Sequence, residues 1–295
     1  MIQEERYYSI STYLKEHFGR KMVKLSIEAG FTCPNRDGTK GYGGCSFCSA
    51  GGSGELASSI EEQIALLQTK WPNAGYLAYF QSHTNTYAPV PRLRELYSRA
   101  LRDPRIEGLA LSTRPDCLPD HVLDLLEEIN EQHFLWVELG LQTVRDDVRR
   151  QLNVGYTLED YDRAVRALRE RGIRVVTHLI LGLPGESEED MFRSLHHVTD
   201  GGIFGLKLHL MNLVKGSPLA EEMPNYTSFP SMDAYVDLVC RMIPQIPPEI
   251  TIHRLTGDVP RKLLLTPEWS YMKRTILNTI HHELAARDLY QGSAL

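Results

Sequence analysis

Apolar runs alternate with amphipathic segments along most of the chain. Six short stretches are almost continuously apolar, which is typical of strands buried on both faces. These stretches begin at Val23, Gly75, Ile106, Phe134, Ile173 and Gly205. Between them apolar residues recur at helical spacing, and one such segment is marked at both ends, by a Thr157–Asp160 capping pair and by Gly172. The alternation predicts an α/β fold, a parallel sheet covered by helices that forms an incomplete or complete barrel.

The two ends of the chain lie outside this alternation. Residues 1–22 predict an N-terminal helical extension around ISTYLKEHFG. The barrel itself is expected over residues 23–216. Residues 217–295 are Pro-rich and end in a helix, and they are expected to cap the barrel or to line its substrate site. Thr266 and Pro267 are typical of the start of that last helix.

Composition and charge narrow the class of protein. The chain has 295 residues, 42% of them hydrophobic and 24% charged, as in a soluble globular protein. Its net charge of -6 argues against a wholly basic nucleic-acid coat, although a local basic groove remains possible. No apolar run is long enough to span a membrane, and MIQEERYYSI is no signal peptide. With three of five cysteines in one loop, we expect a metal site in a reducing cytoplasm.

Polar residues gather where the predicted strands end. Because the carboxyl ends of parallel strands meet at one edge, these residues predict a single site there. The strand ends are Cys33, Gln81–Asn85, Ser112–Asp116, Glu138–Gln142, His178–Gly182 and Lys207–Asn212.

The Gly-rich loop GFTCPNRDGTKGYGGCSFCSAGGSGE contains Cys33, Cys45 and Cys48. Three thiolates can hold an iron–sulfur cluster and leave one position open for chemistry. A structural zinc ion is an alternative, with a histidine as fourth ligand, but the nearest along the chain are His17 and His83. Three unrelated buried thiols are a third interpretation, and their clustering disfavours it. The spacing alone leaves these alternatives open.

Phe47 within Cys-Ser-Phe-Cys adds a further feature, because a C-x-aromatic-C segment after a first strand resembles the radical S-adenosylmethionine (SAM) superfamily. Eleven residues separate Cys33 from Cys45, a spacing longer than the common one and similar to that of the YhcC/YtqA (MnmL-like) family, which is related to the Elongator catalytic subunit. Further blocks resemble the same family in order: YFQSHTNTYAP, STRPDCLPD, ELGLQT, THLILGLPGE, KLHLMNLVKGSPL and HRLTGD.

This resemblance implies a partial TIM barrel of (β/α)6 type and a radical SAM enzyme. It implies that Cys33, Cys45 and Cys48 hold a [4Fe-4S] cluster, and that SAM binds the fourth iron and yields a 5′-deoxyadenosyl radical on reduction. It also implies SAM-binding roles for Phe47, Gln81, Ser82, Asn85, Ser112, Arg114, Glu138, Gln142 and His178.

One position departs from the resemblance. Relatives tend to carry an arginine after the ELGLQT block, where this chain has Val154. Such an arginine would bind the SAM carboxylate through two hydrogen bonds, which a valine cannot do. Either Arg114, Arg149 or Arg150 replaces it, or SAM binds differently.

The substrate is expected to meet basic residues of the last strand and the C-terminal extension, for which ordinary surface charge is the alternative. They are Lys207, His209, Lys215, Arg254 and Lys273. The resemblance to Elongator points to wobble uridine in tRNA, from which the carboxymethyl arm of carboxymethylaminomethyl-uridine would be removed. It also implies an electron donor such as flavodoxin or ferredoxin. A small-molecule or protein substrate is the alternative, and a zinc-binding adaptor without enzymatic activity is a more distant one.

Overall fold

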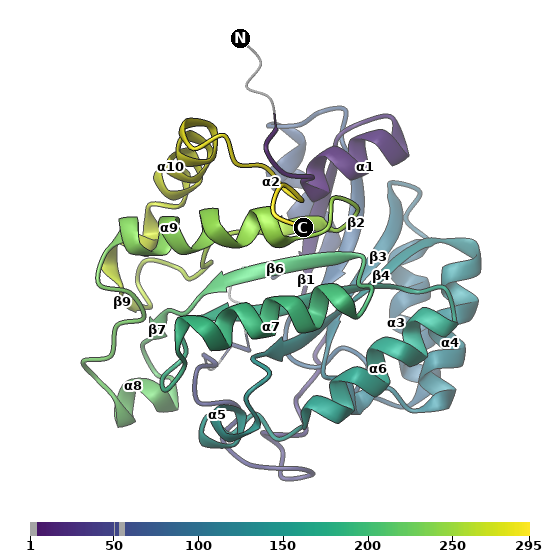
Figure 1. Ribbon diagram of the computed structural model, residues 1–295. Coiled ribbons are helices and arrows are strands. Elements are labelled where there is room, and N and C mark those ends of the chain that lie inside the picture. Colours follow the sequence, from purple (N-terminus) through teal and green to yellow (C-terminus); the bar gives the residue numbers. More distant parts are fainter. Residues whose placement is uncertain (1–4, 50, 53–56) are drawn as a thin grey trace.

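Seven parallel strands form a curved sheet in the computed structural model, which describes residues 5–49, 51–52 and 57–295 (Figure 1). Each strand pairs with the next one along the chain except at the end, where the seventh pairs with β6. The strands are β1 (Met22–Ile27), β2 (Gly75–Phe80), β3 (Ile106–Thr113), β4 (Phe134–Gln142), β5 (Arg174–Leu181), β6 (Gly205–Leu210) and β8 (Thr251–Arg254).

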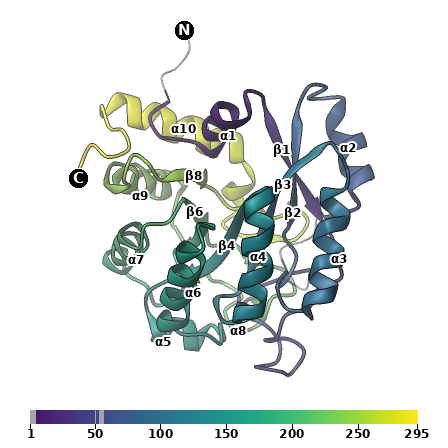
Figure 2. The same cartoon turned by 90° about the vertical axis from the view of Figure 1, so that its right-hand side faces the viewer.

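Helices cover the outer face of this sheet (Figure 2). They are α2 (Ile60–Gln68), α3 (Val90–Leu101), α4 (Asp120–Gln132), α6 (Leu158–Glu170), α7 (Glu188–Asp200) and α9 (Met232–Met242). Leu25, Leu109 and Leu135 belong to the apolar cluster that joins strands and helices. The predicted Thr157–Asp160 capping box is present at the start of α6. The short helix α5 (Asp146–Gln151) follows β4.

The predicted partial barrel is confirmed, with one strand more than expected. The six predicted strands are present, and β8 extends the sheet beyond β6 through the pairs Gly205–Thr251 and Leu206–Ile252. This strand was not predicted because it is only four residues long, TIHR, and lies in the Pro-rich segment before the last helix. The sheet order begins with β1 and ends with β8, so the barrel is not closed by strand pairing.

The predicted N-terminal helix is α1 (Ile10–Phe18), and it packs against one end of the barrel. Leu14 of α1 belongs to an apolar cluster with the inward-facing Leu77 and Trp136. The main chain just before α1 also lies beside β8, where the Ile252 N–H donates to the Tyr8 carbonyl at 2.8 Å. This segment therefore completes the core at the amino ends of the strands.

The C-terminal segment adds a small two-stranded sheet and two of the remaining helices. Strands β7 (Leu213–Val214) and β9 (Leu264–Thr266) pair antiparallel, and α8 (Pro218–Glu222) follows β7. The expected start of the last helix was wrong: α10 is Lys273–Ala286, because Thr266 pairs with Leu213 in β9 instead. No helix in the described part of the chain is long and apolar enough to cross a membrane.

The inward-facing residues form successive layers along the barrel axis, because side chains alternate along each strand. The layer next to α1 is apolar and includes Met22, Leu77, Ala110, Trp136 and Val176. Two residues further along the same strands, a polar layer consists of Lys24, Tyr79, Ser112, Glu138 and His178, with Lys207 from β6. Above it, at the carboxyl ends of the strands, a cavity opens.

Candidate active site

The three loop cysteines line the cavity at the carboxyl ends of the strands. Cys33, Cys45 and Cys48 are all half-buried, and none forms a disulfide. The contact between the Cys45 and Cys48 thiols, together with burial, raises the pKa of Cys45 well above its ordinary value. Asn35 directs its amide Nδ2 at the Cys45 sulfur, 3.8 Å away. The structure thus brings together the three thiols that the sequence singled out.

Glycines allow the cysteine loop to fold tightly. Gly43 and Gly44 have φ angles of 77° and 79°, in the left-handed region that glycine adopts without strain. A Cβ on Gly44 would lie 2.8 Å from Nε of Arg36. Arg36 in turn donates from Nη2 to the Ser49 carbonyl at 2.5 Å. A side chain at position 44 would therefore displace Arg36 from the loop.

The loop is held to the connection between α5 and α6. Asn153 donates from Nδ2 to the carbonyls of Tyr42 and Gly44, at 3.0 and 2.8 Å. Asn35 donates in return to the Asn153 carbonyl at 2.5 Å, and the Ser46 N–H donates to the Leu152 carbonyl at 2.8 Å. These bonds fix the position of the segment that carries Cys45 and Cys48.

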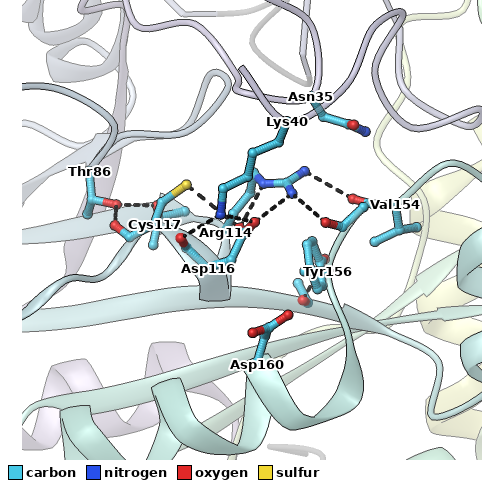
Figure 3. Close-up of polar contacts among 12 residues, drawn as sticks. Asn35, Lys40, Thr86, Arg114, Asp116, Cys117, Val154, Tyr156 and Asp160 are labelled. Atoms are coloured by element: carbon cyan, nitrogen blue, oxygen red, sulfur yellow. Dashed lines mark hydrogen bonds and ion pairs between the residues drawn. The ribbon is translucent and has the colours of Figure 1, made fainter. Parts of the chain in front are cut away.

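Arg114, which directly follows β3, also binds this connection (Figure 3). Its guanidinium donates to the carbonyls of Val154 and Gly155, at 3.0 and 3.4 Å, and forms a bidentate pair with Asp116 at 2.9 and 3.0 Å. Lys40 of the cysteine loop pairs with Asp116 as well, at 2.6 Å. Burial alone would raise the pKa of Asp116, but the pairing with Arg114 and Lys40 outweighs it and lowers that pKa.

Arg114, Arg149 and Arg150 were the candidates to bind the SAM carboxylate in place of an arginine at position 154, and the contacts of each limit that role. Most N–H groups of Arg114 already donate to Asp116 and to main-chain carbonyls. Arg149 is buried, donates to the Thr143 carbonyl and pairs with Asp146, and Arg150 is exposed; neither lines the cavity. Arg36, which the sequence analysis did not consider, does line it.

Most of the other predicted residues surround the same cavity. Phe47, Gln81, Ser112, Arg114, Glu138, Gln142, His178, Lys207, His209 and Arg254 line it. Ser82 and Asn85 are buried and do not line it, and Asn85 Nδ2 donates to the Ser112 carbonyl at 2.8 Å. Lys215 and Lys273 are absent from the lining too. Ser82 Oγ, Asn85 Oδ1 and His209 Nε2 are buried without a hydrogen-bond partner among the described residues.

Glu138 lies at the floor of the cavity and is fully enclosed. Its Oε2 accepts from Tyr79 Oη at 2.6 Å and His178 Nε2 at 2.9 Å, and it pairs with Lys207. Its Oε1 accepts from Trp136 Nε1 at 3.0 Å. Both oxygens are therefore already used by protein groups, so this carboxylate positions other side chains whatever it contributes to SAM.

Neighbouring basic groups keep Glu138 ionised, whereas burial keeps His178 neutral. Burial alone would raise the pKa of Glu138, but Lys207, Lys24 and His178 outweigh it and hold that pKa well below its ordinary value. Burial lowers the pKa of His178 to about 4. A neutral His178 that donates from Nε2 to Glu138 has no proton on Nδ1, which is then an acceptor for a ligand hydroxyl.

Sequence reasoning missed several residues of this site. Tyr79 and Lys24 belong to the polar layer, and Arg36 and Asp258 line the cavity. Lys24 carried a signal, because a charged residue inside the apolar run MVKLSI is unusual unless it is paired. Asp258 also carried a signal, because it ends the block HRLTGD, but no role was predicted for it.

Three half-buried thiols that line one cavity fit the ligand set of an iron–sulfur cluster. No three Cys, His, Asp or Glu side chains converge on one metal position within residues 5–49, 51–52 and 57–295. A [4Fe-4S] cluster needs one thiolate on each of three irons, which are spread over a larger volume. The half-buried thiols, the glycines and the buried unpartnered polar atoms around the cavity are consistent with a cluster and a polar cofactor beside it.

Comparison with known proteins identifies the class. Residues 31–198 match the family model of the radical SAM superfamily, and residues 203–286 match that of the radical SAM C-terminal domain. The chain therefore belongs to the radical SAM superfamily and is a radical SAM enzyme.

Its relatives agree with the predicted branch. The uncharacterized protein YtqA of Bacillus subtilis is 43% identical to this chain, over 98% of this chain and 92% of the length of YtqA. The protein YhcC of Escherichia coli is 40% identical, over 96% of this chain and 93% of the length of YhcC. Elongator complex protein 3 of Schizosaccharomyces pombe is 31% identical over 53% of this chain and 29% of its own.

A solved structure confirms the fold. The archaeal Elp3 of Methanocaldococcus infernus superposes with a TM-score of 0.68 over 92% of this chain and 64% of that one, at 13% identity. At this identity the likeness concerns the fold alone.

Proposed function

We propose that this radical SAM enzyme acts on tRNA and removes the carboxymethyl arm of carboxymethylaminomethyl-uridine at the wobble position. The observation that carries the proposal is a three-thiol cavity in a chain related over about half its length to Elongator complex protein 3. The resemblance of the sequence blocks to the Elongator catalytic subunit points to wobble uridine as substrate.

The cluster and SAM have defined places in this proposal. Cys33, Cys45 and Cys48 would hold the [4Fe-4S] cluster, and Phe47, Gln81, Ser112, Gln142 and His178 line the cavity in which SAM would bind. When bound and reduced by a donor such as flavodoxin or ferredoxin, the cluster and SAM supply a 5′-deoxyadenosyl radical that abstracts a hydrogen atom from the substrate. A hydrogen on the carbon next to the amine of the carboxymethyl arm suits that abstraction. Return of one electron to the oxidised donor would then give an imine, and water would cleave its C–N bond to leave the aminomethyl group and release the arm as a two-carbon aldehyde acid.

A basic rim beside the cavity supports an RNA substrate despite the acidic net charge. Arg261, Lys262 and Arg274 are exposed around β9 and the start of α10. Arg261 lies over the ring of the exposed Tyr271, 4.4 Å from its centroid. An arginine stacked on an exposed aromatic ring offers both charge for phosphate and a flat surface for an unstacked base.

The test is a nucleoside analysis of tRNA combined with reconstitution of the enzyme. Deletion of the gene should leave carboxymethylaminomethyl-uridine in place and deplete the nucleosides that lack the arm, as measured by mass spectrometry. Anaerobically reconstituted protein with SAM and a reductant should restore them. The variant Cys45→Ala should not, whereas Cys240→Ala, which removes a thiol in the core remote from the loop, should.

Two outcomes would contradict the proposal. An unchanged nucleoside profile, with SAM still cleaved by the purified protein, would favour a small-molecule or protein substrate. A colourless protein with one tightly bound zinc ion and no SAM cleavage would favour the adaptor. Binding of tRNA should also weaken steeply with salt, because phosphate contacts release counterions.

A further inference from the structure

Two groups of charged residues line the cavity. Near the cysteine loop, whose Cys45 and Phe47 pack against an apolar cluster that includes Met211, the cation that acts on Cys45 is Arg114 of β3. Strands β6 and β8 carry a second group, Lys207, His209 and Arg254. Lys207 and Arg254 are register partners on these adjacent strands, and His209 follows Lys207 by two residues, so the three side chains belong to the same side of the cavity.

Each carboxylate near this side is shared by two cations. Asp258 pairs with Arg254 at 2.9 Å and also with Lys273. Glu138, at the floor, pairs with Lys207 and lies 3.7 Å from Lys24. The excess of positive charge is clearest around Asp258. One of its two partners is the guanidinium of Arg254, and a guanidinium keeps its proton in a protein. Since burying an uncompensated charge costs free energy, an anionic ligand group on this side would be stabilising.

Arg254 has donors to spare for such a group. Within the described residues its only hydrogen bond runs from Nη2 to Asp258 Oδ2, although a guanidinium has five N–H donors. Its side chain lines the cavity and is 23% exposed, so the guanidinium is screened from bulk water but reachable from the cavity.

His209 supplies a second polar atom. Its Nε2 is buried with no hydrogen-bond partner among the described residues, and its ring lies 4.9 Å from that of His178. Burial lowers the pKa of His209 well below its ordinary value, so the ring is neutral at pH 7 and has one N–H to donate. A buried imidazole without a partner is costly in the folded chain unless a ligand satisfies it.

We propose that Arg254 and His209 form a subsite in the cavity for the carboxylate of the substrate. This inference rests on the proposed function, in which the carboxymethyl arm carries that carboxylate. The subsite explains how the arm would be held with its methylene group toward SAM. It also implies selection for the carboxylated nucleoside over the same nucleoside without the arm, because without the carboxylate the spare donors of Arg254 and the buried His209 Nε2 stay unpaired.

The SAM carboxylate is a poor candidate for the same subsite. In this superfamily the amino and carboxylate groups of SAM bind the cluster, so they must lie beside Cys33, Cys45 and Cys48. Arg254 belongs instead to the electrostatic neighbourhood of Tyr79 and Glu138.

The experiment compares two tRNAs that differ only at the wobble base. One carries carboxymethylaminomethyl-uridine and the other aminomethyl-uridine, and their Kd values are measured with the reconstituted full-length protein at one salt concentration. The wild type should bind the carboxylated tRNA about tenfold more tightly, as expected for one buried charge-assisted pair. Arg254→Gln should reduce this ratio to about one, and Arg254→Lys should retain part of it.

Two controls separate the subsite from other roles. Arg261→Gln, at the basic rim, should weaken binding of both tRNAs by the same factor and leave the ratio unchanged. The Kd for SAM without tRNA should be the same in the wild type and Arg254→Gln. Retention of part of the ratio by Arg254→Lys shows that the site remains folded.

Each contrary result has its own meaning. Equal binding of the two tRNAs by the wild type overturns the subsite while the tRNA proposal stands. Weaker SAM binding in Arg254→Gln assigns Arg254 to SAM and overturns it as well. If neither tRNA binds more tightly than an unrelated RNA, the proposed function fails and the subsite fails with it.

Discussion

The guanidinium of Arg114 donates a hydrogen bond to the main-chain carbonyl of Val154, across 3.0 Å. The position at which the sequence departs from the family resemblance is thus in contact with an arginine from another strand. Arg114 supports the main chain of the α5–α6 connection, and that connection holds the cysteine loop through Asn153. Most N–H groups of Arg114 already donate to Asp116 and to the two carbonyls, so few are left to bind a cofactor.

We expect Arg114→Gln to destabilise the protein and to reduce cluster retention. The change leaves Asp116 buried with only Lys40 as its partner, which should lower the free energy of unfolding by about 3 kcal/mol. Urea unfolding of the cluster-free protein measures this loss, and iron per chain after reconstitution measures retention. Arg150→Gln, at an exposed position of α5, should change neither quantity appreciably. Normal stability with lost SAM affinity in Arg114→Gln would instead assign Arg114 to SAM.

Asn153 offers a cleaner test of the loop attachment. Its φ angle of 52° is left-handed, and its amide makes the two hydrogen bonds to the cysteine loop. Asn153→Ala removes these bonds and disfavours the backbone conformation, at a cost of about 2–4 kcal/mol. Asn153→Gly removes the bonds but adopts the conformation easily, so we expect a smaller loss of about 1–2 kcal/mol.

Iron retention should separate the two effects at position 153. If the hydrogen bonds position Cys45 and Cys48, both variants should bind less iron than the wild type, in spite of their different stabilities. Full iron content in Asn153→Gly would show that backbone conformation alone holds the loop.

The fold was largely predictable because its strands are buried on both faces. Apolar runs such as the one from Phe134 carry the signal of a parallel strand irrespective of their neighbours. The strand β8 carries no such signal, since only Ile252 among its four residues is a strong apolar strand former. It forms because the edge of β6 is available for pairing, which is a property of the tertiary structure.

The site was predictable where chemistry leaves a motif and not where packing decides. Cys33, Cys45 and Cys48 share one loop, so their convergence followed from spacing. The contact between Arg114 and Val154 joins positions forty residues apart, and no local pattern announces it. The same holds for Glu138, which looked like a ligand of SAM and turns out to be enclosed by Tyr79 and Lys207.

The Glu138–Lys207 pair should behave as a buried unit. Glu138→Gln leaves Lys207 and Lys24 without a carboxylate and should lower the free energy of unfolding by about 3–5 kcal/mol. In the double variant Glu138→Gln/Lys207→Met, the uncompensated ammonium is gone, and part of this loss should be recovered. Urea unfolding of the wild type, both single variants and the double variant gives the coupling. Additive losses would mean that the pair contributes nothing beyond its separate side chains.

Glu186 predicts a specific dependence of stability on pH. Neither oxygen of its carboxylate has a hydrogen-bond partner among the described residues, and burial raises its pKa from 4.5 to about 7. Between pH 4.5 and about pH 7, the folded protein therefore keeps a proton on Glu186 that the unfolded chain has released. Stability from this group is present below about pH 4.5 and is lost as the pH rises through about 7.

Replacing this carboxylate by a neutral amide should remove that loss. Glu186→Gln should be about 1–3 kcal/mol more stable than the wild type at pH 8, and similar to it at pH 5, as measured by urea unfolding at both pH values. Glu189→Gln provides the matched control, because Glu189 lies three residues away and is exposed. For it the difference from the wild type should be small and the same at both pH values. A gain for Glu186→Gln that is equal at pH 5 and pH 8 would mean that the amide stabilises by packing, and that ionisation of the buried carboxylate is not what destabilises the wild type in alkaline solution.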